Sequence, residues 1–193
     1  MALDINRYKE IEYSPEAIAI GKVGEDVVSS RLCAKGWNVK RLDKSEGNMN
    51  SGIVDFEIWK TDNSGEITDH ALVEVKTRKS NVYKFTGIPC LTEKFSVCNA
   101  YDNYYKKRNL PLYLFWVCFY DKKIYCQEWR KIFEVRQKID GILYPTVKEI
   151  ADVETFFMPK QMFEFYNNIT ADEFKRWEQA RGKPFKIEEK LPG

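Results

Sequence analysis

The spacing of apolar and polar residues predicts a helix near the start of the chain, followed by a series of strands. Ser14, Pro15 and Glu16 supply an N-cap, a proline at the first helical position and an early acid, and apolar residues then recur at helical spacing as far as Leu32. Gly36 marks the end of this helix. Apolar and β-branched runs predict strands at 37–42, 53–60, 71–78, 112–120 and 124–129, and helical spacing returns at 92–108. This order of elements indicates an α/β fold.

Beyond residue 129 the pattern predicts a mostly helical segment. Thr170 and Glu173 form a capping-box pattern, and Gly182 with Pro184 closes the last predicted helix. The chain has 193 residues, 44% of them hydrophobic, which suffices for a folded core. We therefore expect a single domain over residues 1–193, with a core at about 15–129 and a helical C-terminal extension at about 130–193.

Composition narrows the chemistry that the chain can support. The 31 Lys and Arg nearly balance the 29 Asp and Glu, so any basic surface must come from local clustering. The five cysteines form no CxxC pair and His70 is the only histidine. A structural zinc site therefore lacks ligands, and a Ser/His hydrolase would depend on one side chain. A bound metal would need carboxylate ligands.

Targeting signals are not evident in the sequence. Met1–Tyr13 is charged and has no apolar signal core, and no later stretch is long enough to span a bilayer. The odd number of cysteines, several of them in apolar-periodic segments, is typical of reduced core residues. We expect a cytoplasmic, intracellular protein without a membrane partner.

Two predicted strands bring acidic and basic residues together. Because side chains alternate along a strand, Asp55 and Glu57 share one face of theirs, and Glu74, Lys76 and Arg78 share one face of the next. Glu74 and Lys76 interrupt an otherwise apolar strand, where burying charge is costly unless it is paired or binds a metal. This cost is a reason to suspect a functional site.

These residue types suit phosphodiester hydrolysis. Hard cations such as Mg²⁺ prefer carboxylate oxygens and keep several waters, one of which can attack a phosphodiester. Asp55 and Glu74 would hold the ion, and Lys76 could orient or deprotonate the attacking water or neutralise developing charge. A third carboxylate, Glu25, lies at the margin of the helix face expected to pack on the sheet. Two glycines just before it, Gly21 and Gly24, suggest close approach by backbone or ligand.

Glu25 in the first helix, Asp55 after a glycine-containing loop, and Glu74-Val75-Lys76 on the next strand together resemble the PD-(D/E)xK nuclease superfamily, and within it the archaeal-type Holliday-junction resolvases and restriction-endonuclease-like proteins. The resemblance covers roughly residues 15–129. It implies a restriction-endonuclease-like αβββαβ core with a mixed central sheet flanked by helices. It also implies that Asp55 and Glu74 bind Mg²⁺ or Mn²⁺, that Lys76 assists catalysis and that Glu25 supports the metal site.

The sequence departs from the superfamily pattern at two places. Val54 stands where the motif has its proline, which leaves the carboxylate of Asp55 in place. The second helix has Asn99, Tyr101 and Asn103 where many members have a glutamine, so no active-site residue carries over from that helix.

Several other residues allow either a functional or a purely structural interpretation. Arg78, Lys79 and Lys84 could contact nucleic-acid phosphates or be ordinary surface charge. The basic residues 106–108 at a helix C-terminus suit the helix dipole. Tyrosines 101, 104 and 105 could stack on unpaired bases, although core packing is the simpler reading. Glu57 could instead be a peripheral strand acid, and His70 an incidental loop residue.

The sequence thus predicts a divalent-metal-dependent DNA endonuclease, with Glu25, Asp55 and Glu74 at Mg²⁺, Mn²⁺ able to substitute, and Lys76 assisting the nucleophile. The preference for DNA over RNA follows from what the resemblance implies, and a homodimer is possible. Recombination and repair, restriction, and phage or mobile-element DNA processing all use such a core. The alternatives are an RNA endonuclease with the same site and a non-catalytic nucleic-acid-binding module that retains the fold.

Overall fold

The central feature of the structure is a six-stranded mixed sheet. The computed structural model describes residues 14–42, 54–78, 90–134, 136–150 and 153–182. In the order of the sheet, its strands are β1 (Asn38–Arg41), β2 (Phe56–Thr61), β3 (Ile67–Arg78), β5 (Leu112–Cys118), β6 (Lys123–Glu128) and β11 (Glu164–Asn168). Strands β3 and β5 run parallel, and the other neighbours are antiparallel. The predicted α/β fold with a mixed central sheet is confirmed.

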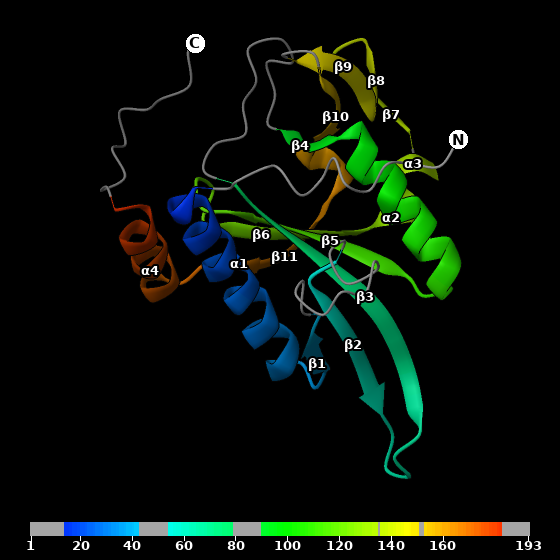
Figure 1. The fold of residues 1–193 in the computed structure, drawn as a ribbon, viewed down its shortest axis with the longest axis vertical. Coiled ribbons are helices and arrows are strands. Elements are labelled where there is room, and N and C mark those ends of the chain that lie inside the picture. Colours follow the sequence, from blue (N-terminus) through cyan, green and yellow to red (C-terminus); the bar gives the residue numbers. More distant parts are fainter. Residues whose placement is uncertain (1–13, 43–53, 79–89, 135, 151–152, 183–193) are drawn as a thin grey trace.

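Helices flank the sheet on both faces. Helix α1 (Pro15–Ala34) and helix α4 (Ala171–Arg181) lie side by side on one face (Figure 1). Helix α2 (Phe95–Arg108) forms the crossover between the parallel strands β3 and β5 and packs on the other face with α3 (Trp129–Glu134). Parallel strands require such a crossover, which explains why a helix separates these two strands in the sequence.

Side-chain alternation along β3 sorts residues into two cores. Val73 and Val75 pack with apolar residues of α1, while Leu72 packs toward α2 with Leu114 of the parallel strand. Glu74 and Lys76 alternate with the valines, so they lie on the α2 face. The candidate acid and base of β3 therefore point into the space beneath α2.

The prediction of a helical C-terminal extension is wrong. Residues 137–168 contain five strands: β7 (Gln137–Ile139), β8 (Ile142–Tyr144), β9 (Thr146–Ile150), β10 (Val153–Pro159) and β11. Among the described residues after 128, the helices are α3, the short helix η2 (Lys160–Met162) and α4. The strands are only three to seven residues long, too short for local periodicity to distinguish them from other elements.

A second sheet is built from both halves of the chain. Strand β4 (Cys90–Lys94) precedes α2 and pairs with β10, which pairs with β9. The predicted second helix accordingly begins at Phe95, because residues 90–94 form β4. Strand β11 joins the central sheet beside β6, so the C-terminal residues contribute to both sheets.

The predicted caps of α1 and α4 are confirmed. The Ser14 hydroxyl accepts a hydrogen bond from the Ala17 N–H at 3.2 Å, and Thr170 and Glu173 form the capping box of α4. Gly182 follows α4 with a φ of +64°, a left-handed conformation that favours glycine.

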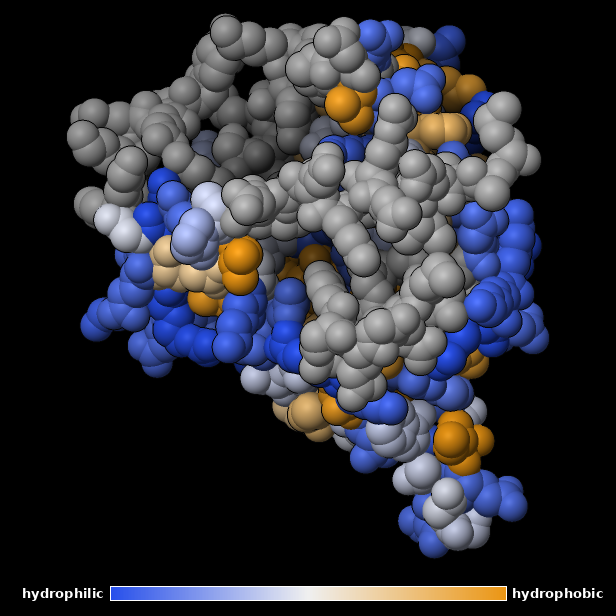
Figure 2. Space-filling view, in the orientation of Figure 1, coloured by the Kyte–Doolittle hydropathy of each residue, from blue (hydrophilic) through white to orange (hydrophobic). Residues whose placement is uncertain are grey.

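The surface seen in Figure 2 is largely hydrophilic in its described part, with apolar residues in small, separate groups. Exposed apolar side chains include Ile18 of α1, Ile67 of β3 and Phe165 of β11, which belong to different elements. Within the described ranges, no helix is both long and apolar enough to cross a membrane.

Candidate active site

Asp55 lies just before β2 and is held against β3. Its side chain is buried, with the residue 4% exposed, and its Oδ2 accepts a hydrogen bond from the Val75 N–H at 2.8 Å. Its backbone N–H donates to the Val73 carbonyl at 3.0 Å, and its carbonyl accepts from the Leu42 N–H at 2.9 Å. The carboxylate therefore sits beside the backbone of β3 at the residue between Glu74 and Lys76.

Glu74 and Lys76 form an ion pair on the α2 face of β3. Lys76 Nζ lies 2.8 Å from Glu74 Oε1, and Glu74 is 6% exposed. Strand alternation predicts that these two residues share one face of their strand, and in the structure they do. An acid and a base thus meet next to the buried carboxylate of Asp55.

Tyr101 of α2 also reaches Glu74. Its hydroxyl donates to Glu74 Oε1 at 3.0 Å, and the residue is 1% exposed. Burial, and after it the charge of Glu74, raises the pKa of Tyr101 well above its ordinary value. The phenol therefore stays protonated as a donor. Tyr101 packs in the core as predicted, and its bond to Glu74 is a contact that sequence reasoning missed.

Helix α1 approaches β3 closely at Gly24. A Cβ atom at Gly24 would lie 1.9 Å from Thr77 Oγ1, so only glycine permits this approach, whereas a Cβ at Gly21 would meet nothing within 4 Å. The close approach that the two glycines predict is therefore present at Gly24 alone. Its neighbour Glu25 lines the same pocket as Asp55, a depression of about 520 Å³.

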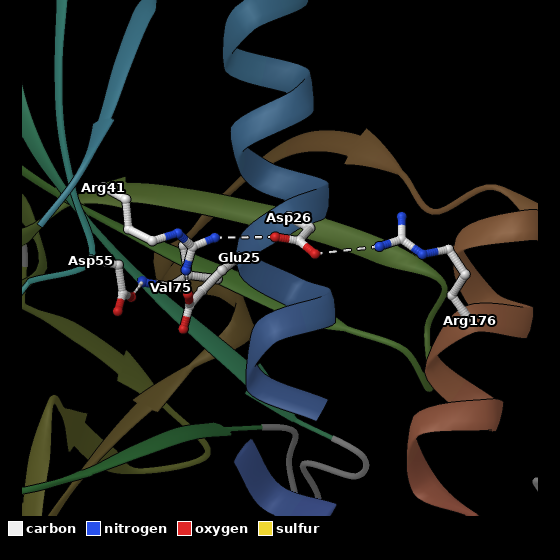
Figure 3. A network of polar contacts seen from close by, with 6 residues as sticks. All are labelled: Glu25, Asp26, Arg41, Asp55, Val75 and Arg176. Carbon is white, nitrogen blue, oxygen red and sulfur yellow. Dashed lines mark hydrogen bonds and ion pairs between the residues drawn. The ribbon is translucent and has the colours of Figure 1, made fainter. Parts of the chain in front are cut away.

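A network of charged groups surrounds Glu25. The Glu25 carboxylate is paired with Arg41 of β1, and Arg41 Nη2 also lies 3.1 Å from Asp26 Oδ1. Asp26 Oδ2 lies 3.4 Å from Arg176 Nη2 of α4 (Figure 3). Figure 3 shows Arg41 and Glu25 on the same side of α1 as Asp55, and Arg176 on the other. Glu25 is thus near Asp55, but Arg41 holds its carboxylate.

The donor set fits a magnesium ion with two protein carboxylates. Among the described residues, no three His, Cys, Asp or Glu side chains converge into a ready metal-binding group. Magnesium commonly takes only one or two carboxylates and keeps several waters, unlike a structural zinc ion. Asp55 and Glu74, both buried and both beside residue 75, can supply those two ligands.

Glu93 is an acidic member of this cluster that the sequence did not single out. It lies on β4, and its Oε2 is 2.7 Å from Lys76 Nζ. The available signal is weak, because Glu93 falls at the start of residues 92–108, which helical spacing predicts as a helix rather than a strand. Its place in the site depends on pairing between β4 and β10, which local pattern does not show.

Glu57 lies apart from this cluster. Glu57 Oε1 contacts His70 Nε2 at 2.7 Å and Arg108 Nη2 at 3.2 Å, so it has the peripheral position that was its alternative reading. The side chains of Arg78, Tyr104 and Tyr105, and residues Lys79 and Lys84 as a whole, fall outside the part of the chain that the structure describes.

Comparisons with known proteins give matches among solved structures. No family model matches the chain, and no curated protein matches it. It is similar to the Holliday junction resolvase Hjc of Archaeoglobus fulgidus, with 10% identity and a TM-score of 0.46 over 74% of this chain and 91% of that one. It is also similar to a nuclease from a fusselovirus, with 8% identity and a TM-score of 0.44 over 82% of this chain and 88% of that one.

Proposed function

We propose that this protein is a divalent-metal-dependent DNA endonuclease that hydrolyses phosphodiester bonds. One observation carries the proposal: the buried Asp55 carboxylate accepts a hydrogen bond from the N–H of Val75, the residue that separates the paired Glu74 and Lys76 along β3. Burying such charges is costly, and a fold retains them where they serve a site. A module that only binds nucleic acid has no need for carboxylates facing phosphate.

Asp55 and Glu74 are the proposed ligands of Mg²⁺, with Mn²⁺ able to replace it. When bound, the ion would polarise the phosphate and supply an activated water. The Val75 N–H orients the Asp55 carboxylate, and the Tyr101 hydroxyl orients that of Glu74. We assign Glu25 to the outer part of the site, because it lines the same pocket as Asp55 and Arg41 fixes its carboxylate.

Lys76 is the proposed partner of the nucleophile. Its ammonium lies beside Glu74, where it can orient the attacking water or neutralise charge that develops on the phosphorus oxygens. Arg78, Lys79 and Lys84 follow it in sequence and are proposed to contact the DNA backbone. The choice of DNA rests on the superfamily resemblance of the sequence motifs.

The deciding experiment compares wild type with Asp55→Asn on supercoiled, linear, branched and single-stranded DNA. Each substrate is incubated with Mg²⁺, Mn²⁺ or a chelator, and products are resolved on gels. We expect wild type to cut at least one substrate internally with either metal and not with chelator. Asp55→Asn should cut the same substrate at least about 100-fold more slowly, because a metal ligand is lost.

Glu57→Gln is the matched control. Glu57 is an acid two residues further along the same segment, but its partners are His70 and Arg108. We expect this variant to cut within about twofold of wild type. Equal cutting by Asp55→Asn and wild type would contradict the proposal. DNA binding without cleavage under every condition would favour a binding module, and faster cutting of RNA would make RNA the substrate.

A further inference from the structure

The ammonium of Lys76 is shared between two carboxylates that come from different sheets. Its Nζ lies 2.8 Å from Glu74 Oε1 and 2.7 Å from Glu93 Oε2. The Glu93 side chain is 10% exposed and that of Lys76 is 19% exposed. Glu74 belongs to the central sheet and Glu93 to the second sheet. The lysine thus bridges the two layers at the candidate site.

The Glu93 carboxylate is held at both of its oxygens. Oε2 contacts Lys76, and Oε1 accepts a hydrogen bond from the Lys94 N–H at 3.0 Å. A carboxylate fixed in this way presents a defined anchor rather than a mobile surface charge. Through the contact of Oε2 with Nζ, this carboxylate can influence the site by holding Lys76.

The position of Glu93 is set by distant parts of the chain. Glu93 pairs with Phe156 of β10, and the Phe156 ring stacks on Phe95 with centroids 5.2 Å apart. The same Phe156 ring meets the edge of Phe133 in α3, with centroids 5.4 Å apart. This aromatic packing holds β10 against α2 and α3, and the pairing of β10 with β4 places the carboxylate that reaches Lys76.

A lysine needs such anchors if it is to act on one atom. Its four-carbon stem is flexible, so a single ion pair leaves the ammonium several possible positions. Contacts with Glu74 and Glu93, and a Tyr101 ring whose centroid lies 5.9 Å from Nζ, restrict it from separate directions. The effect is to hold Nζ between the Glu74 carboxylate and the β4 side of the site.

We propose that Glu93 is a positioning residue for Lys76, supplied to the nuclease site by the second sheet. This inference rests on the proposed function, since it assigns Glu93 a part in the same reaction. Glu93 does not bind the metal in this assignment. It holds the lysine that assists the nucleophile, so its removal should slow the chemical step and leave binding of DNA and of metal unchanged.

The test compares Glu93→Gln with Glu93→Asp in single-turnover cleavage of a DNA that wild type cuts. Glutamine preserves the shape of the side chain and removes its charge, whereas aspartate keeps the charge on a shorter stem. We expect Glu93→Gln to slow cleavage about 10- to 100-fold. Glu93→Asp should recover much of that loss, because the lysine stem can follow a charge that lies one methylene further away. A residue needed only for packing would give the opposite order.

Binding and folding are measured on the same variants. We expect DNA Kd and Mn²⁺ Kd of Glu93→Gln to stay within about twofold of wild type. Glu154→Gln is the matched control, since Glu154 is an exposed glutamate of β10 in the same sheet, and it should cleave like wild type.

The outcomes separate this inference from the proposed function. If wild type does not cut DNA, or cuts no faster than Asp55→Asn, the proposed function fails. If Asp55→Asn is impaired while Glu93→Gln cuts like wild type, only the inference on Glu93 is overturned. A weaker Mn²⁺ Kd would make Glu93 a metal ligand, and loss of folding in Glu93→Gln would make its role structural. Either result overturns the positioning role.

Discussion

At the scale of single residues, the buried charges of the site are compensated in two different ways. The Asp55 carboxylate receives a backbone N–H from Val75, whereas Glu74 and Glu93 both contact the Lys76 ammonium. A hydrogen bond from a backbone N–H to a carboxylate orients it without tying it to another charged side chain. A carboxylate that is paired with lysine is coupled to that side chain.

Replacing Lys76 with alanine tests this coupling. We expect Lys76→Ala to lose most of its turnover, by about 100-fold or more, because general acid–base and charge-stabilising groups contribute effects of this size. It should still bind Mn²⁺ in calorimetry, because the proposed ligands Asp55 and Glu74 remain. Its free energy of unfolding in urea should fall, because two buried carboxylates lose a counter-charge.

Lys123→Ala provides the comparison, since Lys123 is an exposed lysine of β6 in the same sheet. It should change neither the cleavage rate nor the stability appreciably. Loss of metal binding in Lys76→Ala would show that the lysine has another role, and an unchanged cleavage rate would remove it from the mechanism.

At the scale of elements, the contact between α1 and β3 sets where Glu25 lies. Gly24 brings the helix backbone against Thr77, and Val27 and Val28 continue the contact into the core that includes Val75. The price of a glycine inside a helix is about 1 kcal/mol relative to alanine. At Gly24 the close packing explains that cost, and at Gly21 nothing in the described structure does.

The two glycines form a matched pair for mutation. Gly24→Ala should lower the free energy of unfolding by about 1–3 kcal/mol, because its Cβ collides with Thr77 Oγ1 and the helix must shift. Gly21→Ala should raise it by about 0.5–1 kcal/mol, because it improves helix propensity in open space. Urea unfolding followed by circular dichroism measures both.

A second substitution tests whether the clash with Thr77 Oγ1 causes the loss of stability in Gly24→Ala. Combining Gly24→Ala with Thr77→Ala removes the offending oxygen and should recover part of the lost stability. If Gly24→Ala and Gly21→Ala change the stability alike, the contact between α1 and β3 does not depend on the glycine.

At the scale of the whole molecule, the two larger sheets are assembled from interleaved parts of the chain. Strand β10 completes the sheet that contains β4, and β11 completes the central sheet beside β6. Trp177 of α4 is fully buried and stacks on Phe119, with ring centroids 4.8 Å apart. The residues after 129 therefore cover both faces of the core rather than extending from it.

Truncation tests this interdependence. A chain ending at residue 129 lacks β10, β11 and α4, so β4 and β6 lose strand partners and the Phe119 face loses its cover. We expect it to show no cooperative thermal transition by circular dichroism, because too little apolar surface remains buried. A chain ending at Gly182 keeps every described element and should unfold cooperatively. Cooperative unfolding of the chain that ends at residue 129 would contradict this view.

The sequence by itself determined the features that depend on neighbouring residues. The ends of α1 and α4 follow from Ser14, Thr170 and Gly182, and the common face of Glu74 and Lys76 follows from strand alternation. The order of helices and strands through residue 128, apart from β4, follows from the same local periodicities. These signals lie within a few residues of one another along the chain, so no tertiary contact is needed to read them.

Only the tertiary structure decided which distant residues complete the site. Glu93 reaches Lys76 because β4 pairs with β10, Tyr101 reaches Glu74 because α2 packs on β3, and Arg41 holds Glu25 because β1 lies beside α1. Strands β10 and β11 also pair with β4 and β6, which precede them by many residues, whereas β7, β8 and β9 were missed because they are short. Hydrogen bonds between strands join residues far apart in sequence, and short strands stabilised in this way carry little local pattern of their own.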